Sequence, residues 1–87
     1  KAVFFDFNIY PNPNNGNFQV NISELRSGKV DLEVYNIIGE RIYSFTEEIK
    51  NEQWQRNIVI AEAPQGIYFM RITNGGFTAS KKVILGK

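Results

Sequence analysis

The fold is decided by residues 30–42, which read VDLEVYNIIGERI. In the first half of this stretch, three apolar residues alternate with two acids, and this period of two is typical of a strand with one buried and one wetted face. An Asn and Gly39 follow, and both residue types favour turns. The chain is therefore expected to return as a hairpin over residues 41–45, with Ile42 sharing the core with Val34.

The same alternation recurs along the chain, between turn signals such as Ala63-Pro64-Gln65-Gly66 and Asn74-Gly75-Gly76. About seven strands are expected, near residues 3–10, 18–22, 30–34, 41–45, 54–60, 68–72 and 77–85. Their spacing predicts an all-β fold in which two antiparallel sheets form a sandwich. The one helical candidate is a single turn from Ser23 to Arg26, which Ser23 could cap.

Composition limits the class of protein. The chain has 87 residues, 43% hydrophobic and 22% charged, with a net charge of +1, which indicates one small folded domain and does not suit nucleic acid. There is no Cys, so disulfides and thiolate metal sites are excluded. The longest apolar runs are far shorter than the roughly 20 residues of a transmembrane helix. Lys1 opens the chain without an initiator Met or signal region, and we expect a piece of a longer polypeptide.

No catalytic residue, metal ligand or cofactor is predicted. The chain has no His, which removes the commonest general base, the Ser and Cys triads and most zinc sites. The adjacent Glu47 and Glu48 are expected to point to opposite faces of a strand, so they cannot flank one bond. Asp31 and Glu33 share a face and admit a weak cation site or an ion pair, although solvated charge is the simpler interpretation.

Two further groups of residues could bind ligands. The Asn-rich segment 12–17 could offer oxygen atoms to calcium, but neutral amides without a carboxylate bind calcium poorly, and turn geometry explains them better. Four aromatic residues could form a stacking platform for sugars or bases, although most aromatics of so small a sandwich are expected to fill the core. They are Tyr10, Tyr35, Tyr43 and Trp54.

Charge is uneven along the chain. From Ala63 onward there are four bases, Arg71, Lys81, Lys82 and Lys87, and no acid. The last strand is therefore predicted to be a basic edge, suited to an acidic partner or to solubility.

Four short motifs stand in order along the chain. They are Ile9-Tyr10-Pro11-Asn12-Pro13 with Asn15-Gly16 and Phe18-Gln19-Val20, then Leu32 to Asn36 with Gly39 to Ile42, then Pro64 to Ile72, and finally Lys81-Lys82-Val83-Ile84-Leu85. As an ordered set they resemble the C-terminal sorting domain, type A, of type IX secretion system cargo proteins. Two positions depart from that pattern, because Ala63 stands where Leu is usual and Gly86 interrupts the β-branched tail.

The resemblance implies an immunoglobulin-like sandwich of seven strands at the C-terminus of a larger cargo protein. It implies a non-catalytic secretion signal that directs the cargo from the periplasm through the outer-membrane type IX translocon, to the cell surface or the medium. A surface sortase is then expected to cleave upstream and to attach the cargo. On this basis residues 1–8 are a linker or an extension of the first strand, and residues 9–87 are the sorting domain.

The resemblance also implies which residues are read by translocon and sortase components. They are Tyr10, Pro11, Asn12, Pro13, Gly39, Gly66, Tyr68, Lys81, Lys82, Val83, Ile84, Leu85 and Lys87. Our hypothesis places the contact on the last ribbon of two strands, whereas Val83 and Leu85 could instead be core residues. The alternative function is an adhesive or carbohydrate-binding β-sandwich module, and an edge-strand dimer is possible in either case.

Overall fold

The computed structural model describes residues 6–23, 25, 28–50, 53–60 and 62–86, without the side chain of Asp6. Seven strands are present in this part of the chain, as the sequence predicts. They are β1 (Asp6–Tyr10), β2 (Asn17–Ser23), β3 (Gly28–Tyr35), β4 (Arg41–Ile49), β5 (Trp54–Val59), β6 (Gly66–Asn74) and β7 (Phe77–Leu85). The predicted helical turn falls on residues 23–26, of which Glu24 and Arg26 lie outside the described residues and Ser23 ends β2.

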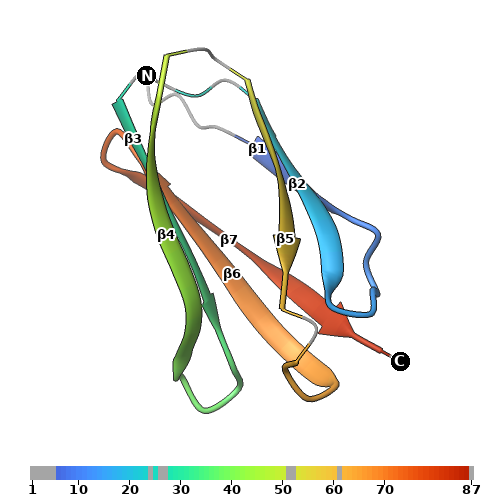
Figure 1. Cartoon of the computed structure of the whole chain (residues 1–87). Helices are drawn as coiled ribbons and strands as arrows, with labels where there is room; N and C mark the ends of the chain where they lie inside the picture. Colours follow the sequence, from blue (N-terminus) through green and yellow to red (C-terminus); the bar gives the residue numbers. More distant parts are fainter. Residues whose placement is uncertain (1–5, 24, 26–27, 51–52, 61, 87) are drawn as a thin grey trace.

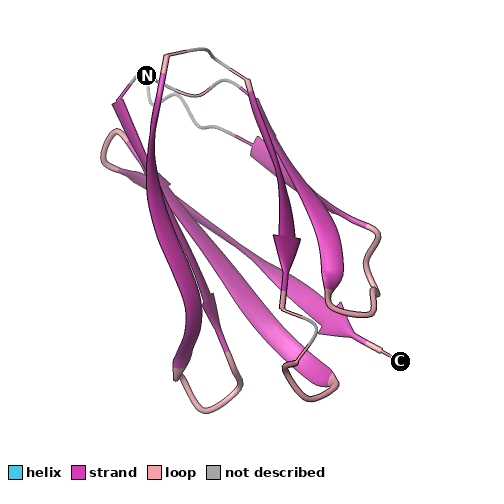
Figure 2. Ribbon diagram, viewed as in Figure 1, coloured by secondary structure: helices cyan, strands magenta, loops and turns pink. Residues whose placement is uncertain are grey.

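The strands form two antiparallel sheets that face each other (Figures 1 and 2). One sheet has three strands in the order β1-β2-β5, and the other has four in the order β4-β3-β6-β7. This is an immunoglobulin-like sandwich in which the fourth strand pairs with the third, whereas in a constant-type domain it joins the sheet of the first two. Every strand in the described part pairs only with antiparallel neighbours within its sheet.

The core lies between the two sheets and is built from alternate residues of every strand. In β2 and β3 the predicted inward residues are all buried, as are Tyr68, Met70 and Ile72 of β6. Burial of each such side chain contributes about 1.5–3 kcal/mol. Most of the large apolar residues in the described part of the chain meet in this one cluster, which holds the two sheets together.

The prediction that Ile42 shares the core with Val34 is wrong. Val34 is paired with Tyr43, and the next residue, Tyr35, is paired with Arg41, so Ile42 is an extra residue in β4. Such a β-bulge shifts the alternation by one position. Ile42 is consequently 39% exposed, and the half-buried Tyr43 takes its place against the core.

The open side of the sandwich between β4 and β5 is closed by an ion pair. Arg56 of β5 donates to Glu47 of β4, and its guanidinium lies 5.8 Å from the ring centre of Phe45 and 5.4 Å from that of Trp54. Glu47 and Glu48 point to opposite faces, as predicted, and Glu47 is half-buried and paired with Arg56. The Trp54 indole N–H is buried without a hydrogen-bond partner among the described residues.

Candidate functional site

The Tyr10-Pro11-Asn12-Pro13 motif begins the connection between β1 and β2, which crosses to the edge of the other sheet and returns. It follows β1, which pairs with β2, and both X-Pro bonds of the motif are cis. Beyond it, Asn14 forms an isolated parallel bridge with Leu85 of β7. The segment therefore leaves the three-stranded sheet and reaches the free edge of the four-stranded one, as Figure 1 shows.

The side chain of Asn12 binds the backbone of β7. Its amide donates to the carbonyl of Lys82 at 2.9 Å, and its Oδ1 accepts the N–H of Ile84, also at 2.9 Å. This one side chain therefore binds two backbone groups at the edge of β7 that a neighbouring strand would otherwise bind. The partners lie 70 and 72 residues apart in the sequence.

Asn14 continues the contact with its own backbone. Its N–H donates to the carbonyl of Ile84 at 2.9 Å, and its carbonyl accepts the N–H of Gly86 at 2.7 Å. The Asn14 side chain is buried, accepts from Gly16 N–H and donates to the carbonyl of Pro11. We call residues 12–14 together with residues 82–86 the terminal clasp, since four hydrogen bonds hold them together.

The terminal clasp occupies backbone donors at the end of the chain. The N–H groups of Ile84 and Gly86 are both bound inside the clasp, so neither is offered to a partner. The Asn-rich segment serves turn geometry, as predicted, because Oδ1 of Asn14 and of Asn15 each accepts a backbone N–H two residues ahead. Lys87 lies outside the described residues.

The two lysines of the closing motif point to opposite faces of β7. Lys82 stands opposite Phe69 on the outer face of the four-stranded sheet, next to the exposed Ile67. Lys81 lies on the same face of β7 as the buried Val83, and its Nζ lies 5.4 Å from the ring centre of Phe7 on β1. The two lysines therefore do not form one basic patch, and of the two only Lys82 lies on the outer face.

Val83, Leu85 and Tyr68 are core residues. Val83 and Leu85 are 0% and 1% exposed, which confirms the interpretation of them as core, while Ile84 between them points outward and is half-buried. The hydroxyl of Tyr68 donates to the carbonyl of Pro64 four residues upstream. This is the tyrosine corner found at the start of the sixth strand of immunoglobulin-like sandwiches.

The two predicted glycines occupy positions that require glycine. Gly39, with φ of +87°, ends the β3–β4 turn, and Gly66, with φ of +151°, begins β6 opposite Leu85. In the β3–β4 turn the Oδ1 of Asn36 accepts the N–H groups of Ile38 and Glu40. This fixed turn leaves two adjacent isoleucines, Ile37 and Ile38, exposed at its tip.

Glu33, for which solvated charge was the simpler interpretation and an ion pair the alternative, is the centre of an ion-pair network. Its two carboxylate oxygens accept from Arg41 at 3.2 Å and from Arg71 at 2.9 and 3.1 Å. Arg71 also donates to the Tyr35 hydroxyl and lies over its ring. The hydrogen bond from Arg71 lowers the pKa of Glu33 below its ordinary value of 4.5, against the opposing effect of burial.

This pKa predicts a pH dependence of stability. Because the pKa of Glu33 is lowered in the folded state, its contribution is complete above 4.5 and is lost as the pH falls through the lowered value. We expect Glu33→Gln to reduce the free energy of unfolding at neutral pH and to differ less from wild type in acid. Urea denaturation at pH 7 and at about pH 3 measures this, and a difference that is equal at both pH values would contradict it.

No other arrangement in the described part of the chain suggests chemistry. It contains no group of three His, Cys, Asp or Glu that could hold a metal ion, and no helix long and apolar enough to cross a membrane. The four aromatics that could form a stacking platform are not assembled into one. Trp54 is buried, Tyr43 faces the core, Tyr35 lies under Arg71 on the outer face of one sheet, and Tyr10 is exposed on the other sheet.

Sequence reasoning missed two features of the structure. It did not find the partners of Asn12 and Asn14 in the clasp, and it did not find a row of amide side chains on the outer face of the three-stranded sheet. Asn12 was expected to be recognised from outside, whereas its side chain is bound within the molecule. The available signal was the absence of charge from residues 8–23, which contain six Asn, all at outward or loop positions.

Comparison with known proteins agrees with this structure. No curated protein matches the chain. A family model described as "Secretion system C-terminal sorting domain" matches residues 8–86, and these include the clasp and the β6–β7 ribbon. Cargo proteins with such domains are exported across the outer membrane and reach the cell surface or the medium. The chain belongs to this family, the C-terminal sorting domains of the type IX secretion system.

Proposed function

We propose that the domain is a non-catalytic address label that a type IX translocon component reads on the outer face of the β6–β7 ribbon. The observation that supports this most is the terminal clasp, because it joins the opening and closing motifs into one rigid unit at the free edge of β7. A label that is read as a folded shape needs such a fixed surface.

The proposed contact surface is apolar with a basic side chain beside it. Ile67 and Phe69 are each 44% exposed, Ile84 is half-buried, and Lys82 is exposed opposite Phe69. From residue 63 onward the chain has no acid. A partner with an apolar patch and acidic side chains would complement this surface, and the charge would mainly raise the rate of encounter.

Replacing Lys82 with glutamate tests the surface without touching the core. We expect Lys82→Glu to keep the melting temperature of the wild type and to reduce export of the cargo, because its charge now opposes that of the acidic partner. Lys50→Glu is the matched control, since Lys50 is exposed in the β4–β5 loop and carries the same change of charge. Normal export of a folded Lys82→Glu variant would contradict the proposed surface.

Fusion of residues 1–87 to a periplasm-targeted fluorescent protein tests the sorting function itself. In a host with a type IX system, fluorescence should appear at the surface or in the medium, and only when the translocon is intact. Retention of a folded fusion in the periplasm would contradict the proposal. The whole chain is used because Phe7, before the predicted start at Ile9, is a core residue of β1.

Sortase cleavage followed by surface attachment completes the proposal. We place the cut upstream of Asp6, because a cut within β1 would remove strand pairing with β2 and the buried Phe7. Mass spectrometry of the domain released by cells would give its N-terminus. The adhesive-module alternative gains no support from the aromatic residues, because the structure distributes them over both sheets and the core.

A further inference from the structure

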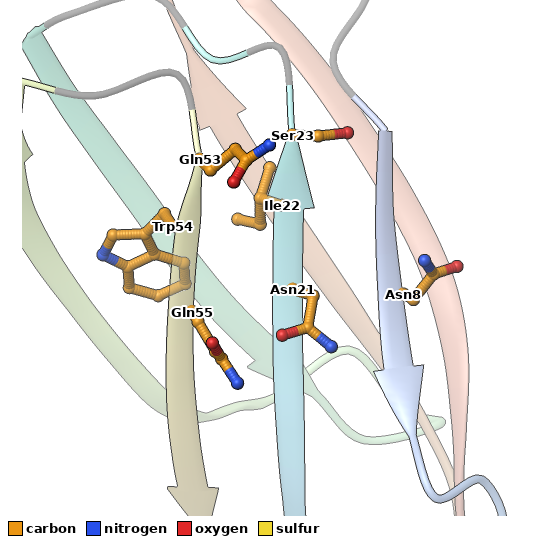
Figure 3. Close-up of a pocket in the computed structure, with 7 residues that line it drawn as sticks. All are labelled: Asn8, Asn21, Ile22, Ser23, Gln53, Trp54 and Gln55. Carbon is orange, nitrogen blue, oxygen red and sulfur yellow. The ribbon is translucent and has the colours of Figure 1, made fainter.

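A row of amide side chains crosses the outer face of the three-stranded sheet. Asn8 of β1 is paired with Asn21 of β2, and Asn21 is paired with Gln55 of β5. Gln53 and Ser23 extend the row at one end, and these five residues line a shallow hollow of about 520 Å³ with Ile22 and Trp54. Figure 3 shows the side chains on three neighbouring strands, with Asn21 in the middle. We call this set of five residues the amide face.

The amides of this face have hydrogen-bonding capacity to spare. Among the described residues, none of the side chains of Asn8, Asn21, Gln53 and Gln55 makes a hydrogen bond. In contrast, Asn57 and Asn17, farther along the same face, bind each other at 2.9 Å. Each free amide has two donor hydrogens and a carbonyl acceptor. The face therefore offers a mixed array of donors and acceptors rather than a surface of one kind.

The amide face carries no charge. Residues 8–23 contain no charged residue, and the outward positions of β5, namely Gln55, Asn57 and Val59, are neutral as well. Arg56 lies on the opposite, inner face of β5 and is bound to Glu47 at the open side of the sandwich. The one charged residue that the β1–β2 pairing places next to this set is Asp6, opposite Ser23 at its end. Phosphate-rich and acidic ligands would therefore lack a counter-charge along the row, and the neutral amides favour an uncharged ligand.

We propose that the amide face binds a neutral oligosaccharide. Sugar hydroxyls both donate and accept hydrogen bonds, which matches a row of free amides spaced along three strands. The volume of the hollow lies within the range of small-molecule sites, and its exposed lining is the five polar residues of the amide face, since Ile22 and Trp54 are only 2% and 8% exposed. Tyr10, 67% exposed, stands on the same face one row away, opposite Gln19.

This binding is separate from the sorting function. Lys82 and Phe69 lie on the four-stranded sheet, whereas the amide face is on the other sheet and points outward from it. The domain could therefore hold surface polysaccharide and contact a translocon component at the same time. Loss of one activity leaves the other measurable.

Nuclear magnetic resonance of the ¹⁵N-labelled 87-residue chain tests the proposal, because side-chain NH₂ groups give their own signals. The probes are uncharged hexasaccharides of glucose, mannose and N-acetylglucosamine. We expect at least one of them to shift the NH₂ signals of Asn8, Asn21, Gln53 and Gln55, with a dissociation constant of about 1 mM. The double variant Asn21→Ala/Gln55→Ala should weaken this binding by about tenfold or more, since each loses its hydrogen bonds to the sugar.

The matched control is Ser44→Ala/Ser80→Ala, which removes two exposed polar groups from the outer face of the four-stranded sheet. It should bind the oligosaccharide as the wild type does, and both double variants should keep the wild-type melting temperature. Two outcomes would overturn the proposal. One is no shift of the four NH₂ signals with any probe at 10 mM, roughly ten times the expected dissociation constant. The other is a shift that follows protein concentration without sugar, which would make the face a contact between copies.

Discussion

Replacing Leu85 with alanine is expected to lower the free energy of unfolding by about 2–5 kcal/mol. Leu85 is 1% exposed, pairs with Gly66 and is bridged to Asn14, so its neighbours cannot easily move in to fill the space. Small domains have a total stability of about 5–15 kcal/mol, so this is a large fraction. Urea denaturation followed by circular dichroism measures the change.

Ile84→Ala is the matched control for this prediction. Ile84 is the adjacent residue, loses the same kind of side chain and is only half-buried on the outer face, so we expect a loss below about 1.5 kcal/mol. Equal losses of unfolding free energy for Leu85→Ala and Ile84→Ala would contradict the placement of Leu85 on the buried face and Ile84 on the outer face of β7. The same two variants also separate folding from recognition in an export assay. Reduced export of the Leu85→Ala variant would follow from its unfolding, whereas reduced export of a folded Ile84→Ala variant would indicate a lost contact with the partner.

Opening the terminal clasp is the second change with a large expected effect. The double variant Asn12→Ala/Asn14→Ala removes two hydrogen bonds from the edge of β7 and leaves the buried Gly16 N–H without its acceptor. The buried Gly16 N–H costs about 1–3 kcal/mol when it loses its acceptor, and each of the two exposed hydrogen bonds contributes about 0.5–1 kcal/mol, so we expect a loss of about 2–4 kcal/mol. The backbone amide of Ile84 should then exchange its hydrogen much faster with solvent.

Asn15→Ala is the control for the clasp. Asn15 is exposed, and its side chain only accepts the N–H of Asn17 at 3.2 Å, so a loss below about 1 kcal/mol is expected. An Ile84 amide as well protected in the double variant as in the wild type would show that Asn12 does not hold β7. Sedimentation at several concentrations would also show whether the freed edge pairs between copies, as exposed edge strands can.

Much of the fold could be predicted from the alternation of residues. The period of two in Phe18–Ile22 and Val30–Val34 identified both the strands and their buried faces, because side chains of successive strand residues point to opposite sides. The turns were equally predictable, since Gly39 and the Asn74-Gly75-Gly76 run are local signals. The bulge at Ile42 was missed, because the register between two strands depends on the partner as well as on the strand itself.

The candidate site was less predictable than the fold. Lys81 and Lys82 read as one basic run, but the pleat separates them onto two faces of β7. Asn12 read as part of a motif to be recognised from outside, yet its partners stand 70 and 72 residues away. Those hydrogen bonds exist only once β1 and β7 occupy opposite sheets of the sandwich.

The sequence by itself determined the strands, the turns and the family, because each depends on residues close together along the chain. Only the tertiary structure decided which motif residues are bound inside the domain and which are offered to a partner. It joined Asn12 and Asn14 to β7, buried Val83 and Leu85, and aligned Asn8, Asn21 and Gln55 in one row. The physical reason is that neighbours across sheets and strands are set by packing and register, which no local pattern contains.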